Sequence, residues 1–189
     1  MRIGAVPDIV LETERLILRT AAEGDVDLFD RHLNTPAMRR HLGGPQDRYE
    51  IERYEAKNQA SFAQHGFGWM AMLEKTTGEF VGQSGLKRVD AKGASFTGDL
   101  EIGWLVREDR WRRGYAREAV TAVLGWAFEV HDAPHVVALT SEANAPSWRF
   151  MEAIGLKRRD DLDFVDPDYP PEENPTKVYA ITREQWERA

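Results

Sequence analysis

The chain has 189 residues, of which 42% are hydrophobic and 30% are charged, so we expect one soluble globular domain over residues 1–189. A formal net charge of −7 argues against a broad nucleic-acid-binding surface, and no apolar stretch is long enough to span a membrane. The absence of cysteine excludes disulfides, thiolate metal sites and a cysteine nucleophile, and the lack of a signal-peptide apolar region at the N-terminus predicts a cytoplasmic protein.

The first half of the chain predicts a strand, two helices separated by a loop rich in glycine and proline, and a hairpin of two strands. In the first strand, Leu16 and Leu18 share one face and Ile17 the other. The predicted elements span residues 11–19, 23–33, 48–64, 68–74 and 80–89, and the hairpin turn spans residues 75–79.

The second half predicts a strand–helix–strand–helix unit followed by a closing hairpin. Its clearest element is an amphipathic helix whose alanine, valine, leucine and phenylalanine residues fall on one stripe. The predicted elements span residues 99–106, 114–129, 135–140, 146–155, 156–164 and 177–182. Together the two halves predict an α/β (α+β) fold, a mixed sheet with helices on both faces.

The junction between the strand at 99–106 and the long helix is typical of an anion site. The first N–H groups of a helix lack acceptors within the helix, and its dipole favours negative charge there. Arg112 and Arg113 add positive charge, and Gly114 lets a ligand approach the backbone closely. We interpret this loop as one that binds the phosphates of a cofactor; the alternative is an ordinary helix start with two solvated arginines.

Glu101 lies on the strand that leads into this loop, on the same face as Gly103 and Leu105. If partial burial raises its pKa toward neutrality, its carboxylate can act as a general base, directly or through water. A carboxylate at a sheet edge, or one paired with an arginine, is the alternative interpretation.

Asn144 and Ser147 stand at the predicted start of the following helix. Asparagine in this place is most often an N-cap, but it also lies near the carboxyl end of a strand, where ligands of such sheets bind. His131 and His135 have a spacing seen in metal sites, yet Pro134 separates them and no third ligand is near, so we expect no metal.

Seven segments together resemble the GNAT superfamily of acetyl-CoA-dependent N-acetyltransferases, and within it the RimJ/RimL-type branch that acetylates the N-termini of ribosomal proteins. The resemblance covers nearly the whole chain. The segments are LETERLILR (11–19), GEFVG (78–82), EIGW (101–104), WRRGYA (111–116), NAPS (144–147), EAIGL (152–156) and YAIT (179–182).

The resemblance implies a mostly antiparallel central sheet in which a splayed pair of strands holds acetyl-CoA. The pantetheine arm lies along one strand like an added strand, the loop amides hold the pyrophosphate, and Asn144 contacts the thioester end. The implied cofactor-binding residues are Trp104, Leu105, Val106, Trp111, Arg112, Arg113, Gly114, Tyr115, Ala116 and Asn144.

The resemblance also implies direct attack of an amine on the thioester, without an acyl-enzyme. Glu101 then removes a proton from the amine, and backbone N–H groups of residues 104–106 polarise the carbonyl. Many relatives protonate the leaving thiolate with a tyrosine, but Met151 occupies that position here. Ser147 is the nearest candidate donor; release of an unprotonated thiolate is the alternative.

We expect the acceptor to be the amine of a protein or peptide N-terminus. An acetyltransferase for a small-molecule amine (an antibiotic, a polyamine or an amino acid) is the second hypothesis, and a non-catalytic acyl-CoA-binding module is the third. The sequence leaves a homodimer open, and the fold alone does not fix the acceptor.

Overall fold

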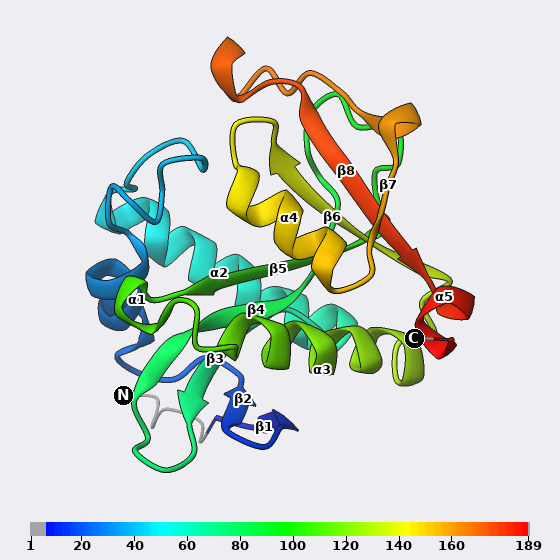
Figure 1. The fold of residues 1–189 in the computed structure, drawn as a ribbon. Helices are drawn as coiled ribbons and strands as arrows, with labels where there is room; N and C mark the ends of the chain where they lie inside the picture. The colour runs from blue at the N-terminus through cyan, green and yellow to red at the C-terminus, as the bar shows by residue number, and fades with distance from the viewer. Residues whose placement is uncertain (1–6, 189) are drawn as a thin grey trace. The chain divides into compact units, whose positions relative to one another are not determined.

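A computed structural model describes residues 7–188 (Figure 1). These residues group into two compact units. Of these residues, unit 1 contains those up to Leu86 together with Gly103–Val123, and unit 2 contains Lys87–Ile102 together with those from Leu124 onward. Each unit therefore combines two separate stretches of the sequence. A single domain over residues 1–189 stays a prediction.

Unit 1 begins with a β-hairpin and two helices and continues into the strands that lead to the glycine-containing loop. Its elements are β1 (Ile9–Glu12), β2 (Leu16–Arg19), α1 (Asp25–Leu33), α2 (Arg48–His65), β3 (Trp69–Glu74), most of β4 (Phe80–Arg88), the end of β5 (Leu100–Val106), a 3-10 turn at Glu108–Arg110 and the first half of α3 (Tyr115–Glu129). The expected boundaries of α2, β3, β4, β5 and α3 are confirmed to within one residue.

Unit 2 contains the end of β4 from Lys87 onward, the start of β5, the end of α3 and the elements after α3. These are β6 (His135–Ser141), α4 (Ala145–Ala153), β7 (Lys157–Arg158), β8 (Thr176–Thr182) and α5 (Arg183–Glu187), with 3-10 turns at Asp160–Leu162 and Pro171–Glu173. The helix α5 has no counterpart in the sequence prediction. It begins at a capping box, in which Thr182 accepts from the Gln185 N–H and the Gln185 side chain accepts from the Thr182 N–H.

The strands pair in the order β1-β2-β3-β4-β5-β6-β8-β7. In unit 1, β1, β2, β3 and β4 pair antiparallel in succession. In unit 2, β6 pairs in parallel with β5, where Glu101 lies opposite Val137, and antiparallel with β8, which in turn pairs with β7. The expected mixed, mostly antiparallel sheet is confirmed.

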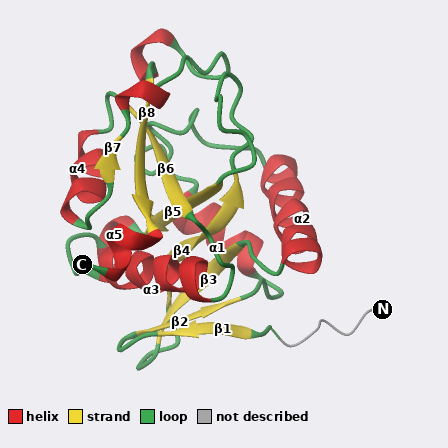
Figure 2. Ribbon diagram, turned by 90° about the vertical axis from the view of Figure 1, so that its right-hand side faces the viewer, coloured by secondary structure: helices red, strands yellow, loops and turns green. Residues whose placement is uncertain are grey.

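The helices of unit 1 are held by burial of their apolar faces. Phe29 and Leu33 of α1 and Ile51 of α2 form one cluster with Ala71 and Phe80 of the strands. Figure 2 shows α2 and the first half of α3 on opposite sides of β3 and β4. Both faces of these strands are therefore covered, which explains why β4 is buried from Phe80 to Leu86 instead of alternating.

Two expected strands are wrong in extent. Residues 11–19 form two strands, because Thr13 closes a tight turn: its N–H donates to the Leu16 carbonyl, and its hydroxyl accepts from the Leu16 N–H, each at 2.9 Å. Residues 156–164 contain a strand of two residues. Beyond it the chain turns at Asp160–Leu162, where Asp163 pairs with Arg158.

No helix within residues 7–188 combines the length and the apolar character that crossing a bilayer requires.

Candidate functional site

The glycine-containing loop occupies the end of β5 and the start of α3, in unit 1. After the 3-10 turn at Glu108–Arg110, the chain passes through two residues with left-handed backbone angles, Arg112 with a φ of 59° and Gly114 with a φ of 83°. Glycine adopts this backbone conformation without strain, whereas a residue with a side chain, such as Arg112, rarely adopts it. The loop conformation is thus specific, and it leads directly into the first turn of α3.

The backbone N–H groups of residues 112–116 point to no acceptor within the described part of the chain, residues 7–188. The first bond of the helical ladder runs from the Glu118 N–H to the Gly114 carbonyl at 3.1 Å. Consecutive free donors at the positive end of a helix dipole form a binding site for an anion. These donors fit the diphosphate of acetyl-CoA, which the resemblance predicts here.

The strand before the loop is tied to it by Trp111. The Trp111 indole donates to the Val106 carbonyl at 2.6 Å, and the Arg107 N–H donates to the Val81 carbonyl at 2.9 Å. A Cβ on Gly82 would lie 2.0 Å from the Leu105 carbonyl oxygen, so that carbonyl faces β4. Because backbone groups alternate along a strand, those of Trp104 and Val106 face the other edge.

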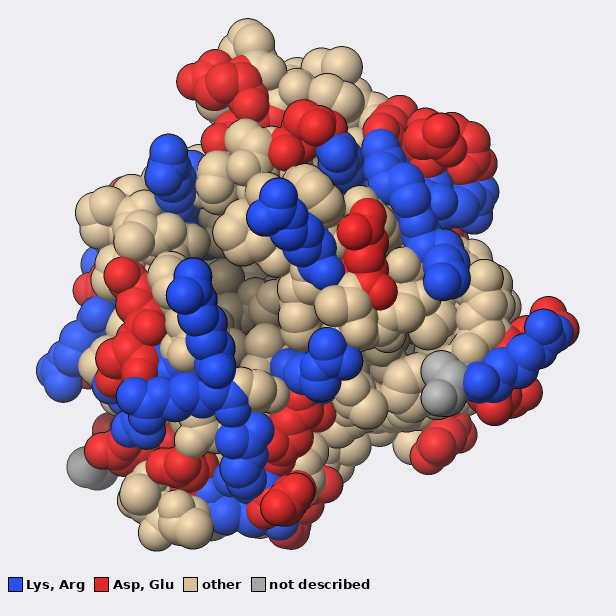
Figure 3. Space-filling model, in the orientation of Figure 1, with Lys and Arg blue, Asp and Glu red and all other residues tan. Residues whose placement is uncertain are grey.

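Charges around the loop are mixed rather than uniformly positive. Arg110 pairs with Glu79, and Arg107 pairs with Asp109 through two hydrogen bonds of 3.0 and 2.9 Å. Figure 3 shows Lys and Arg side chains interspersed with Asp and Glu. Neither Arg112 nor Arg113 forms an ion pair with a carboxylate within residues 7–188, although the pKa of Glu74, lowered mainly by its hydrogen bond with Tyr115, is lowered further by the charge of Arg113. Both arginines can therefore meet an added anion.

The hydroxyl of Tyr115 donates to Glu74 Oε1 at 2.5 Å, which joins the first turn of α3 to the end of β3. This hydrogen bond lowers the pKa of Glu74 and raises that of Tyr115. The Tyr115 side chain is buried, so within the predicted site Tyr115 contributes its backbone N–H and not its hydroxyl.

Glu101 lies in unit 2, where its partner is a lysine and not the arginine that the sequence left open. Lys87 Nζ is 3.3 Å from Glu101 Oε2 and donates to Asp90 Oδ1 at 3.0 Å. Glu101 Oε2 is itself buried without a hydrogen bond. Burial raises the pKa of Glu101, and the attraction of Lys87 opposes that rise. A buried carboxylate with a raised pKa can accept a proton near neutral pH.

Asn144 caps α4, also in unit 2. Its Oδ1 accepts from the Ser147 N–H at a long 3.4 Å, so the capping interpretation is confirmed for this oxygen. The Asn144 amide nitrogen and the Ser147 hydroxyl make no hydrogen bond within residues 7–188, and both can serve a ligand. Met151 is buried in the same helix.

The two histidines with metal-like spacing have other partners. His135 Nε2 lies 2.7 Å from Asp99 Oδ2, and His131 packs edge-on against the Trp126 ring with centroids 4.5 Å apart. No set of three or more potential ligands is grouped to hold a metal ion among residues 7–188.

Three charged residues that the fold brings into contact with predicted site residues or with the loop were not identified from the sequence. Lys87 meets Glu101, and Arg15 and Glu118 meet at the loop. The Lys87 contact follows from strand register: Val89 N–H donates to the Asp99 carbonyl at 2.9 Å, which places Lys87 opposite Glu101 in an antiparallel pair. This contact could have been predicted if the first residue of the turn after β4 had been known, because the turn sets the register of the two strands.

Residues 15–157 match the family model described as an acetyltransferase (GNAT) domain. The uncharacterized protein YkkB of Bacillus subtilis is 29% identical over 147 residues, which are 77% of this chain and 84% of that protein. The FsC-acetyl coenzyme A-N(2)-transacetylase of Aspergillus fumigatus is 35% identical over 130 residues, 65% of this chain and 53% of the relative.

Among solved structures, an acetyltransferase from Agrobacterium tumefaciens superposes with a TM-score of 0.75 at 28% identity, covering 97% of this chain and 98% of that one. The match extends over both units of the sequence.

Proposed function

Because the chain belongs to the GNAT acetyltransferases and is therefore an acetyl-CoA-dependent N-acetyltransferase, we propose that the backbone of residues 112–116 holds the diphosphate of acetyl-CoA. The observation that carries this proposal is the row of N–H groups there that have no protein acceptor. Gly114, at a φ of 83°, lets the diphosphate approach the main chain, and Arg112 and Arg113 add charge.

The pantetheine arm pairs with the edge of β5 that faces away from β4. We propose that this pairing uses the backbone of Trp104 and the N–H of Val106, and that Leu105 contributes its side chain, because the Leu105 carbonyl faces Gly82 and backbone groups alternate along a strand. A backbone N–H on that edge also polarises the thioester carbonyl. Asn144 binds near the thioester through its amide nitrogen. Trp111 is the predicted cofactor-binding residue without a direct role in this proposal, because its indole donates to the Val106 carbonyl.

Bound acetyl-CoA supplies an acetyl group activated as a thioester. A neutral primary amine attacks the carbonyl carbon, so that a C–N bond forms and the C–S bond breaks. Glu101 accepts the proton that the nitrogen loses, through an intervening water. Ser147 passes a proton to the departing sulfur while its oxygen takes one from water, so that the hydroxyl is regenerated; release of an unprotonated thiolate is the alternative. Lys87, whose Nζ lies 3.3 Å from Glu101 Oε2, opposes the rise in the pKa of Glu101 that burial causes, and so favours the ionised carboxylate.

The acceptor that we favour is the amine at a protein or peptide N-terminus, by resemblance to the RimJ/RimL branch. A small-molecule amine is the second candidate, and the Aspergillus relative is named as an FsC-acetyl coenzyme A-N(2)-transacetylase. The α-amine of a peptide has a pKa of about 8, so a substantial fraction is already neutral and nucleophilic near pH 7.5.

The experiment is to incubate the protein with acetyl-CoA and a panel of N-terminal peptides and small amines, and to follow the release of free thiol. Acetylation of peptide N-termini supports the first acceptor, and turnover of small amines alone supports the second. Binding of acetyl-CoA without turnover of any amine would contradict the catalytic proposal. Arg113→Glu, which reverses the charge next to the donors, should weaken acetyl-CoA binding in the same preparation.

A further inference from the structure

We infer that Arg15 and Glu118 are positioning residues that hold residues 112–116 in the conformation that binds a diphosphate. The inference rests on the proposed function of this loop, and both residues lie in unit 1 with it. Arg15 belongs to the turn between β1 and β2, within the first segment of the family resemblance, to which sequence reasoning assigned no role.

Arg15 reaches the loop directly. Its Nη1 donates to the Arg113 carbonyl at 2.9 Å, and its guanidinium lies over the Tyr115 ring, 4.6 Å from the centroid. In a trans peptide unit, the carbonyl of one residue and the N–H of the next point in opposite directions. Holding the Arg113 carbonyl toward Arg15 therefore directs the Gly114 N–H away from Arg15, as one of the donors assigned to the diphosphate.

Glu118 fixes the Arg15 side chain in this position. Its Oε2 accepts from Arg15 Nε at 2.6 Å, and its Oε1 accepts from the Arg15 N–H at 2.7 Å and from the Thr13 hydroxyl at 2.5 Å. The Glu118 side chain is 16% exposed, so the pair is partly shielded from water. Its hydrogen bonds outweigh the effect of burial and lower the pKa of Glu118, so the carboxylate stays charged.

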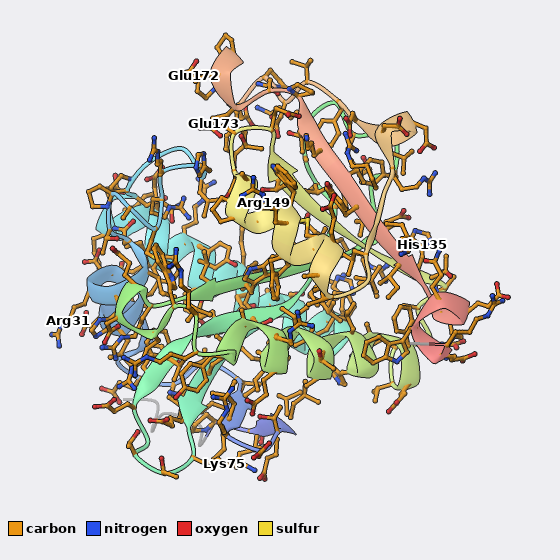
Figure 4. All side chains as sticks on the ribbon, viewed as in Figure 1. Arg31, Lys75, His135, Arg149, Glu172 and Glu173 are labelled. Atoms are coloured by element: carbon orange, nitrogen blue, oxygen red, sulfur yellow. The ribbon has the colours of Figure 1, made fainter. Side chains whose placement is uncertain are left out.

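The turn that carries Arg15 is anchored independently of the loop. The Lys75 N–H donates to the Arg15 carbonyl at 2.8 Å, and Lys75 Nζ donates to the Thr13 carbonyl at 2.6 Å. Figure 4 labels Lys75 in the hairpin between β3 and β4. Arg15 is thus held by the sheet on one side and by α3 on the other, which gives the loop a rigid support.

The absence of a side chain at Gly114 leaves room for the Arg15 guanidinium as well as for a ligand. A Cβ at this position would lie 3.2 Å from Arg15 Nη2, closer than most real Cβ contacts. A side chain here would push the guanidinium away from the Arg113 carbonyl, in addition to the strain of a φ of 83°. The absence of a side chain at 114 and the presence of an arginine at 15 therefore serve the same loop conformation.

The test compares two acetyl donors in the full chain: acetyl-CoA, and acetyl-pantetheine, which lacks the diphosphate. If Arg15→Ala leaves the loop in its binding conformation about one tenth of the time, the KM for acetyl-CoA rises about tenfold. The KM for acetyl-pantetheine and the kcat with either donor stay within about twofold, because the groups that react are unaffected. Glu118→Gln, which loses the acceptor for Arg15 Nε, gives a smaller change of the same kind.

Arg48→Ala is the matched control. Arg48 is an arginine of unit 1 that pairs with Asp27 of α1 and with Glu52 of α2, so its loss removes similar ion pairs without touching the loop. We expect the control to leave both KM values unchanged. An equal rise of both KM values in Arg15→Ala, or no rise in either, would overturn the inference.

The proposed function fails in a different way. If the wild-type protein uses acetyl-CoA no better than acetyl-pantetheine, the assignment of the diphosphate to this loop is wrong. If the wild type prefers acetyl-CoA and Arg15→Ala keeps that preference, the loop assignment stands and the positioning role of Arg15 is wrong.

Discussion

The replacement Lys87→Met tests the role of Glu101 as the general base. Lys87 Nζ lies 3.3 Å from Glu101 Oε2, in a pair whose side chains are 37% and 13% exposed. At this distance two unit charges attract by about 1 kcal/mol at the dielectric of water and by about 5 kcal/mol at an effective dielectric of about 20. Because Lys87 is partly exposed, water screens this attraction. We therefore use an attraction of about 1.5 to 3 kcal/mol between Lys87 and Glu101, which corresponds to a change of about one to two units in the pKa of Glu101.

The direction in which the pH profile shifts depends on which protonation state of Glu101 is active. The base must be ionised, so the rate falls as the pH drops through its pKa. Burial already raises this pKa, and loss of Lys87 raises it further. In Lys87→Met the acidic limb of the kcat/KM profile should therefore move to higher pH by about one to two units, with the high-pH plateau preserved.

The assay is thiol release across a pH series with one amine, so that titration of the amine is common to all variants. Asp90→Asn is a control of opposite sign, because the negative charge of Asp90 raises the pKa of Glu101, and its loss should shift the limb slightly to lower pH. An acidic limb at the same pH in the wild type and in Lys87→Met would refute the assignment of that limb to Glu101, as would a limb that survives in Glu101→Gln.

Further predictions concern the loop and the fold. Arg113→Glu should weaken acetyl-CoA binding at least tenfold in calorimetry; unaltered affinity would contradict the loop assignment. Gly103→Ala places a Cβ 2.3 Å from Trp69 Cη2, so thermal unfolding should show a loss of about 1–3 kcal/mol, and an unchanged Tm would contradict this. Asp47→Ala removes the capping box of α2 and should cost about 1 kcal/mol in urea unfolding; no loss would show that the cap is dispensable. The lowered pKa of Glu118 contributes stability above its unfolded pKa near 4.5 that is lost as the pH falls toward the folded value. Glu118→Gln should therefore flatten the pH dependence of Tm in acid, and a slope equal to that of the wild type would argue against it.

The elements that could be predicted from sequence are those with a strong local pattern. The stripe on α3 repeats at the helical period, and Ala119, Val123 and Leu124 are buried as that pattern requires. The anion-binding character of the loop is also a local property, since unpaired N–H groups occur at the start of every helix. Gly114 marks the position where the chain turns into that helix.

The elements that were predicted wrongly depend on side-chain hydrogen bonds at turns. The turn that splits residues 11–19 is closed by the Thr13 side chain, and the pattern of Leu16 and Leu18 is the same whether one strand or two precede it. The end of β7 likewise depends on the pair of Arg158 with Asp163, which hydrophobic periodicity does not show.

The sequence by itself determined the family, the order of the longer helices and strands, and the stretch of main chain proposed to bind a diphosphate. Periodicity, glycine placement and short motifs are local properties that can be recognised without knowledge of the fold. Only the tertiary structure decided which charges meet. Arg15 and Glu118 are 103 positions apart, and Lys87 finds Glu101 through the register of two paired strands. Such partners are far apart in the sequence and meet only in the folded chain. In the proposals above, they influence the pKa of the proposed base and the conformation of the loop.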